Sequence, residues 1–160
     1  MELYLMRHGI AEDGEPGSPD SARRLTEEGK VKAAGVLKLA KKAGVQPDLI
    51  LSSPYVRAME TAQIAKDVLG VAGEIVELPA LVPHGTPENV WRDIRDYGDY
   101  STILLAGHEP LMGHLAGYLL NAPSLVVEVK KASVIRIDFA GTGPSPRGVL
   151  RWMLVSAMVE

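Results

Sequence analysis

Short runs of Leu, Ile and Val recur along the chain and are separated by longer polar or amphipathic stretches. Aliphatic and β-branched residues in runs of this length are typical of buried β-strands. The runs predict strands at Leu3 to Met6, Leu49 to Leu51, Glu74 to Glu77, Thr102 to Ala106, Val134 to Phe139 and Val149 to Val155. The segments between them are long enough to hold helices.

The stretch after the first strand has a helical pattern. Thr26 is a good N-terminal cap, and the following EEGKVKAAGVLKLAKKAG has acids in its first turn, lysines near its end and Gly44 as a stop signal. The apolar positions predict a core-facing side made of Val31, Ala34, Leu37 and Leu39.

A second helix is predicted to run from Pro54 or Tyr55 to Leu69, with Gly70 ending it. Its predicted core-facing side consists of Val56, Met59, Ile64 and Val68. Two shorter helices, each led by a proline, are predicted at Pro87 to Asp96 and at Pro110 to Leu120.

The alternation of strands and helices predicts an α/β fold. We expect a three-layer sandwich in which a mostly parallel, mixed sheet of about six strands has helices on both faces. The last two strands are joined by AGTGPSPRG, which predicts an antiparallel hairpin at one edge of the sheet. With no internal repeat and no interdomain linker, residues 1–160 are expected to form a single domain.

Composition narrows the class of protein. Apolar residues at 46% and charged residues at 23% are ordinary for a globular protein, and a net charge of −3 argues against a general nucleic-acid binder. The absence of cysteine excludes disulfides, thiolate metal sites and a cysteine nucleophile. Since the opening apolar run breaks at Arg7 and no later run reaches membrane-spanning length, we expect a cytoplasmic protein without a membrane partner.

Candidate chemistry gathers where the predicted strands end. The first strand leads into MRHG, the second into LSSPYVRAMETA and the fourth into LLAGHEP. Ligands of open α/β sheets bind at the carboxyl ends of the strands, so Arg7, His8, Arg57 and His108 are expected to converge there. Two arginines and two histidines beside helix N-termini suit a phosphoryl group, which one histidine could attack while the other groups offset charge. The residues alone do not say which histidine attacks.

Each of these signals has a simpler explanation when taken singly. An Arg-His pair after a strand is usually a surface turn, and GHEP could be a plain entry into a helix. Arg57 in a first helical turn opposes the macrodipole, which favours an anion nearby. His114 has the position of a helix-face histidine, and no metal-binding spacing is present, so no metal is expected.

The combined motifs resemble the histidine phosphatase superfamily, which is named for its Arg-His-Gly motif, and most closely its small SixA-like phosphohistidine phosphatase branch. The resemblance covers nearly the whole chain and rests on LYLMRHGIA, RRLTEEGKVKA, DLILSSPYVRAMETAQIA, ELPALVPHG and LLAGHEPLMGHLAGYLL. It implies that His8 is the nucleophile that becomes phosphorylated and that Arg7, Arg57 and His108 complete the phosphate pocket. It implies no metal or organic cofactor.

Other residues are expected to contact the substrate. Gly9 would give room for a close backbone approach or a positive φ. Arg23 could reach the phosphate from its loop, or could simply be a solvent-facing charge, and Ser18 lies in the same loop with several acids. His84 and Glu109 are candidate acids or substrate contacts, although a loop histidine is more often a surface residue.

One departure from the larger relatives concerns the acid that protonates a leaving group. Many of them have a glutamate where ELPALVPHG places Ala80. An alcohol needs such a donor more than an imidazole does, so the departure favours a phosphoramidate substrate. We therefore expect hydrolysis of phosphohistidine on a signalling protein, with inorganic phosphate as a product. The alternatives are a small-molecule phosphomonoesterase or mutase-like enzyme and a non-catalytic phosphate-binding module.

Overall fold

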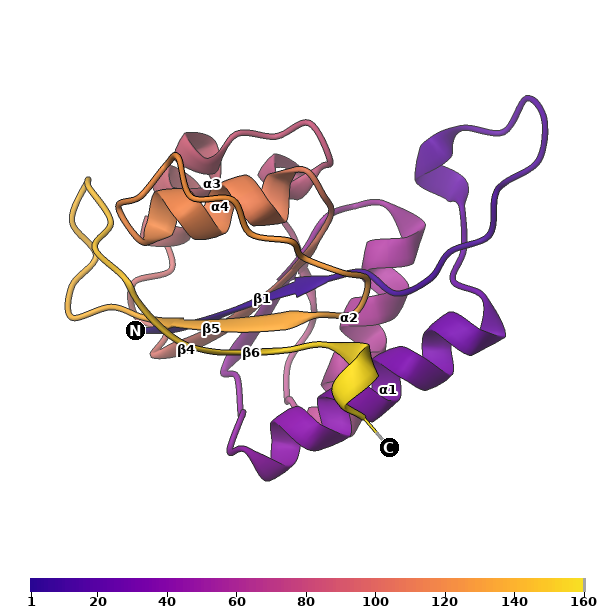
Figure 1. Ribbon diagram of the computed structural model, residues 1–160, viewed down its shortest axis with the longest axis horizontal. Coiled ribbons are helices and arrows are strands. Elements are labelled where there is room, and N and C mark those ends of the chain that lie inside the picture. The colour runs from indigo at the N-terminus through magenta and orange to yellow at the C-terminus, as the bar shows by residue number, and fades with distance from the viewer. Residues whose placement is uncertain (160) are drawn as a thin grey trace.

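The computed structural model describes residues 1–159 and shows a six-stranded sheet with the strand order β3-β2-β4-β1-β5-β6 (Figure 1). The strands are β1 (Glu2–Arg7), β2 (Leu49–Ser52), β3 (Val76–Glu77), β4 (Thr102–Gly107), β5 (Val134–Asp138) and β6 (Val149–Leu154). The first four are parallel to their neighbours, whereas β5 is antiparallel to β1 and β6 is antiparallel to β5. The predicted mixed sheet and its edge hairpin are confirmed.

Four α-helices cover the sheet on both faces. They are α1 (Glu27–Lys42), α2 (Val56–Leu69), α3 (Pro87–Arg95) and α4 (Leu111–Leu119), and the short 3-10 helices are η1 (Asp20–Ala22), η2 (Pro79–Leu81) and η3 (Ser156–Met158). Helices α1 and α2 pack on one face and α3 and α4 on the other (Figure 1). Within residues 1–159, none of the helices has the length and apolar character needed to cross a membrane.

Alternate residues of β1 pack into the two halves of the hydrophobic core, one on each face of the sheet. Leu3 and Leu5 pack with residues of α3 and α4, while Tyr4 and Met6 pack with residues of α1 and α2. All four are buried, because β1 lies inside the sheet with both faces covered. The packing of β1 on both faces thus holds the residues that follow the strand in a fixed position.

The predicted helix boundaries hold to within one or two residues. The Thr26 hydroxyl accepts a hydrogen bond from the Gly29 N–H at 2.9 Å and caps α1. Gly70 adopts the left-handed conformation, with φ of 68°, and ends α2. Local capping signals therefore placed these helices correctly.

The predicted core faces of α1 and α2 were wrong in part. Val31 is 71% exposed, and α1 instead buries Gly29, Ala33, Val36, Leu37 and Ala40. On α2 the larger apolar residues Val56, Met59, Ile64 and Val68 are only half-buried, and the buried face is made of Arg57, Ala58, Thr61, Ala62, Ala65 and Leu69. Small side chains occupy the contact because they let α2 approach the sheet and α1 closely.

Candidate active site

The four residues predicted to form the site lie together at one edge of the sheet. Arg7 is the last residue of β1 and His8 follows it, while His108 follows β4, the parallel neighbour of β1. Arg57 is the second residue of α2, which begins shortly after β2 on the other side of β4. The carboxyl ends of three parallel strands thus deliver all four side chains.

His8 is held in one tautomer by its two neighbours. Its Nδ1 lies 2.7 Å from the Gly9 carbonyl oxygen, which can only accept, and its Nε2 lies 3.3 Å from Arg57 Nε, which can only donate. Nδ1 therefore carries the hydrogen and Nε2 the lone pair. Burial, together with the charges of Arg57, Arg7 and Lys131, lowers the pKa of His8 to about 4, against a raising effect of the Gly9 carbonyl. His8 is a neutral ring with a free nucleophilic nitrogen at pH 7.

His108 is held through its Nε2 by a side-chain hydroxyl. Its Nε2 lies 2.8 Å from the Ser53 hydroxyl, which already accepts the Tyr55 N–H at 3.2 Å and so has its own hydrogen to donate. When the hydroxyl donates to Nε2, the hydrogen of His108 is on Nδ1, a buried atom without a partner among residues 1–159. Burial, with the charges of His8 and Arg57, lowers the pKa of His108 to about 3. A neutral N–H donor thus stands 5.1 Å from His8, measured between ring centroids.

Of the two arginines of the site, Arg57 is buried and Arg7 is half-buried. Arg57 is 4% exposed, and its two terminal nitrogens donate to the Asp20 backbone oxygen at 2.8 Å and to Asp20 Oδ2 at 3.0 Å. Arg7 donates to the Val129 carbonyl at 2.9 Å, while its Nε is buried without a partner in the described chain. Burial lowers the pKa of Arg7, an effect that Glu109 opposes. One buried and one half-buried guanidinium group make a strong site for a dianion.

Thr61 ties the loop after β1 to helix α2. Its hydroxyl donates to the Arg57 carbonyl at 2.7 Å and accepts the Gly9 N–H at 3.2 Å. Gly9 itself meets the first turn of α1: a Cβ on it would lie 3.0 Å from the Gly29 oxygen, and a Cβ on Gly29 would collide with the backbone of Ile10. Of the two explanations for Gly9, close backbone approach is confirmed, since Gly9 is absent from the positive-φ glycines.

The remaining predicted residues do not hydrogen-bond to the four central side chains within residues 1–159. Arg23 reaches the site through Asp20, whose Oδ1 lies 2.8 Å from Arg23 Nε. Glu109 accepts the Gly113 N–H at 2.6 Å and so caps the first turn of α4. Ser18 and His84 are exposed in turns. Their roles toward a substrate stay predictions.

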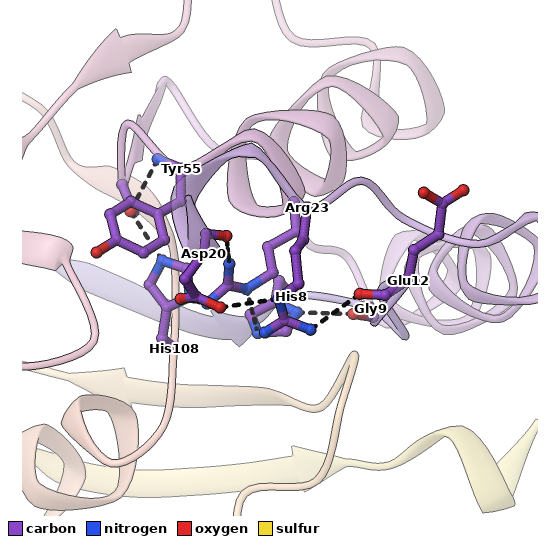
Figure 2. Close-up of polar contacts among 9 residues, drawn as sticks. His8, Gly9, Glu12, Asp20, Arg23, Tyr55 and His108 are labelled. Atoms are coloured by element: carbon purple, nitrogen blue, oxygen red, sulfur yellow. Dashed lines mark hydrogen bonds and ion pairs between the residues drawn. The ribbon is translucent and has the colours of Figure 1, made fainter. Parts of the chain in front are cut away.

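Four neighbours of the site were not predicted: Asp20, Ser53, Tyr55 and Thr61. Figure 2 shows Asp20 and Arg23 gathered with His8 and His108. The ring of Tyr55 contacts both His108, at 5.0 Å between centroids, and the Arg57 guanidinium, at 5.1 Å. Ser53, Tyr55 and Thr61 stand in the SSPYVRAMETA stretch that also carries Arg57, so their nearness in sequence was the available signal. Nothing distinguished Asp20 from the other acids of its loop.

No group of three or more potential metal-binding side chains occurs within residues 1–159.

Lysines border the site on the side of α1. A hollow of about 440 Å³ is lined by Arg7 and by Lys32, Lys130 and Lys131. It shares Lys32 and Ser156 with a second hollow of about 840 Å³, which runs between α1 and η3 and is also lined by Lys38 and Lys42. We call the two together the lysine groove.

A family model described as "Histidine phosphatase superfamily (branch 1)" matches residues 3–82. The chain belongs to this superfamily. Phosphohistidine phosphatase SixA of Escherichia coli (strain K12) is 29% identical over 147 residues, which are 89% of each chain. An uncharacterised protein of Picosynechococcus sp. (strain ATCC 27264 / PCC 7002 / PR-6) is 31% identical over 139 residues, 84% of this chain and 83% of that protein.

Solved structures of histidine phosphatases have the same fold. The protein histidine phosphatase SixA complexed with tungstate matches with a TM-score of 0.87 at 24% identity, covering 98% of each chain. Structures of an alpha-ribazole phosphatase from Shigella flexneri and of a phosphoserine phosphatase from Entamoeba histolytica also match, at 20% and 18% identity. The superfamily and its SixA relative support phosphatase activity for this chain, with the substrate left open.

Proposed function

We propose that this histidine phosphatase hydrolyses phosphohistidine on a signalling protein through a covalent phosphoryl intermediate on His8. The observation that carries the proposal is the fixed tautomer of His8, whose Nε2 lone pair faces a cluster of cations while the Gly9 carbonyl holds Nδ1–H. We keep a single domain, a cytoplasmic location and the absence of nucleic-acid or membrane partners as expectations.

In the first step, His8 Nε2 attacks phosphorus as the bond from phosphorus to the substrate nitrogen breaks. The electron pair of that bond stays with the departing imidazole. Arg7, Arg57 and the Nδ1–H of His108 offset the charge on the phosphoryl oxygens, and their burial strengthens this effect. The Gly9 carbonyl stabilises the Nδ1–H of His8 as positive charge develops on the ring.

In the second step, water attacks the phosphoryl group and His8 Nε2 departs with the electron pair of its bond to phosphorus. The proton lost by the water goes to the phosphate that is released, so His8 returns to its neutral form. The same donors serve both steps, because the phosphoryl oxygens keep their places while the attacking and leaving groups exchange sides.

The preference for phosphohistidine rests on Ala80 and on the charge state of Asp20. Ala80 lies in η2 where many relatives have a glutamate. Asp20 is the carboxylate that contacts Arg57, and although burial acts to raise its pKa, hydrogen bonds from Arg23 and Arg57 lower it, so the group is ionised at pH 7. An imidazole leaves without a strong acid, whereas an alkoxide does not. The SixA relative supports the same substrate class.

A small-molecule phosphomonoesterase is the second candidate. Solved phosphatases named for alpha-ribazole phosphate and phosphoserine share this fold, which therefore does not by itself select a protein substrate. Comparing turnover of a phosphohistidine protein with turnover of phosphoserine and sugar phosphates decides between the two functions. Faster turnover of the small esters would contradict our proposal.

The intermediate is tested by mixing the enzyme with a phosphohistidine protein or phosphoimidazole, quenching, and searching for an acid-labile phosphoryl group by mass spectrometry. We expect the adduct on His8 and a loss of turnover of at least about a thousandfold in His8→Ala. His114→Ala is the matched control, since His114 is exposed on α4 and should keep full activity. Full turnover in His8→Ala excludes the mechanism, and it also excludes a non-catalytic module.

A further inference from the structure

Asp20 binds Arg57, the arginine that is expected to bind the phosphoryl group of a substrate. All three nitrogens of the Arg57 guanidinium are engaged: Nε with His8 Nε2 at 3.3 Å, and the other two with the backbone and carboxylate oxygens of Asp20. Figure 2 shows Asp20 beside His8 and His108. The 3-10 helix η1 thus places a carboxylate of the chain itself on the cationic group that would otherwise hold a substrate oxygen.

This carboxylate disfavours a bare phosphate dianion. Phosphoryl oxygens that reach the terminal nitrogens of Arg57 either displace the carboxylate or lie within a few ångströms of it, where like charges repel. The repulsion acts beside the buried Arg57, and water screens it only from the exposed side of Asp20. Any phosphate ester that brings only negative charge meets this opposition.

A phosphohistidine brings a group that reverses the effect. When the ring nitrogen that does not bear the phosphoryl group is protonated, the leaving group has an N–H and a positive charge, both of which suit a carboxylate. The side chain of Asp20 is 58% exposed, so it can contact a ring that enters from solvent. The hydroxyl of an alcohol or sugar leaving group offers no such charge.

The geometry points to Asp20 as a specificity-determining residue: its carboxylate opposes phosphate dianions as such and favours those whose leaving group is a protonated imidazole ring. This inference rests on the proposed function and gives the site a reason to prefer phosphohistidine. No proton leaves the substrate ring for Asp20. The bond from phosphorus to nitrogen breaks, its electron pair neutralises the ring, and the distal N–H stays in place.

Arg23 acts as a positioning residue that holds Asp20 while its carboxylate contacts the substrate ring. It donates to Asp20 Oδ1 at 2.8 Å and to the Glu12 carbonyl at 3.0 Å, so it anchors one carboxylate oxygen independently of Arg57. The other oxygen, Oδ2, can then turn from Arg57 to the substrate ring without η1 unfolding. The loop arginine predicted to contact substrate thereby gains a role through Asp20.

The test compares wild type with Asp20→Asn, which keeps the shape of the side chain and removes its charge. Asp13→Asn is the matched control, because Asp13 is exposed in the same loop and forms no hydrogen bond or ion pair with Arg57 within residues 1–159. Calorimetry measures the affinity for inorganic phosphate, and kinetics give kcat/KM for phosphoimidazole and for 4-nitrophenyl phosphate. The first substrate carries an imidazole leaving group and the second does not.

We expect Asp20→Asn to bind inorganic phosphate about tenfold tighter and to lower the ratio of kcat/KM for phosphoimidazole to that for 4-nitrophenyl phosphate by about tenfold. Asp13→Asn should leave both quantities unchanged. An unaltered ratio in Asp20→Asn, or an unaltered phosphate affinity, overturns the inference. Asp20→Ser provides the same comparison if thermal unfolding shows that the asparagine variant does not fold.

The outcome is separable from that of the proposed function. A wild-type enzyme that hydrolyses neither phosphoimidazole nor a phosphohistidine protein contradicts the proposed function. The binding measurement needs no turnover, and it still decides whether Asp20 competes with an anion for Arg57.

Discussion

His8 and His108 are both neutral at pH 7, but different partners hold their rings. The Gly9 carbonyl leaves His8 with a lone pair on Nε2, and the Ser53 hydroxyl leaves His108 with a hydrogen on Nδ1. In the mechanism that we propose, two residues of the same type serve as nucleophile and as hydrogen-bond donor. Their backbone and hydroxyl partners, rather than the rings themselves, decide which role each one takes.

This arrangement predicts an unusual titration. In the free enzyme, NMR should show the ring of His8 gaining its proton with a midpoint near pH 4 and that of His108 near pH 3. In denaturant both should titrate near the ordinary value of about 6.5. A midpoint near 6.5 for His8 in the folded enzyme would contradict the burial argument.

The same shifts affect stability. Between about pH 6.5 and about pH 4 the unfolded chain binds protons that buried His8 does not, so acid favours unfolding. The contribution to the free energy of unfolding is therefore fully present above about pH 6.5 and decreases as the pH falls toward 4. Urea unfolding across this range measures it, with His8→Ala expected to show a weaker dependence on pH.

At this scale the sequence predicted the central residues because of a simple geometric rule. Arg7 is the last residue of a parallel strand, His8 and His108 each directly follow one, and the carboxyl ends of such strands share one edge. Asp20 was out of reach because AEDGEPGSPD contains several acids without a periodic pattern. Only the folded loop determines which of them meets Arg57.

Helix α2 presents small side chains to the sheet. Ala58, Ala62 and Ala65 are fully buried there, which brings the helix close and fixes the depth at which Arg57 enters the site. Hydrophobic patterning gives most weight to large side chains, and it therefore placed the core face on Val56, Met59, Ile64 and Val68. Close packing selected by size is difficult to infer from one sequence.

Enlarging this face should be costly. Ala62→Leu is expected to lower the free energy of unfolding by about 1–3 kcal/mol, because the added methyl groups have no space between α2 and the sheet. It should also reduce kcat/KM by displacing Arg57. Urea denaturation and steady-state kinetics check both, with Gln63→Leu on the exposed side of α2 as control. Equal free energies of unfolding for the two variants would show that the contact between α2 and the sheet can accommodate a larger side chain.

At the scale of the whole molecule, charge is unevenly distributed. The chain has a net charge of −3, yet the lysine groove runs from the catalytic edge along α1. Within residues 1–159 only Lys32 among its lysines forms an ion pair, with Glu28. A protein substrate bound over His8 would therefore meet a positive border on this side.

A prediction follows for substrates of different size. The double variant Lys38→Glu with Lys42→Glu should raise KM for a phosphohistidine protein by roughly three- to tenfold, because the electrostatic attraction of an acidic partner is reversed. Turnover of phosphoimidazole should not change. Lys41→Glu with Lys66→Glu, outside the groove, is the control. Equal effects on both substrates would exclude a docking role for these lysines.

The layers of the molecule followed from the sequence, but the order of its strands did not. Periodicity and capping residues identify which segments are strands and which are helices. They do not show that β4 lies between β1 and β2, a placement that depends on how the crossover helices pack. The edge hairpin was an exception, because its two strands are close in sequence.

The close approach of Gly9 to Gly29 has a bearing on mutational tolerance. Gly29 is outside the predicted site, yet any side chain on it would strike the backbone of Ile10 and push the segment that carries His8 away from α1. A survey of all single substitutions would therefore rank Gly29 with the catalytic residues. Sensitivity at that position would report on where the nucleophile is held, and a screen that ignored this would assign it a chemical role it does not have.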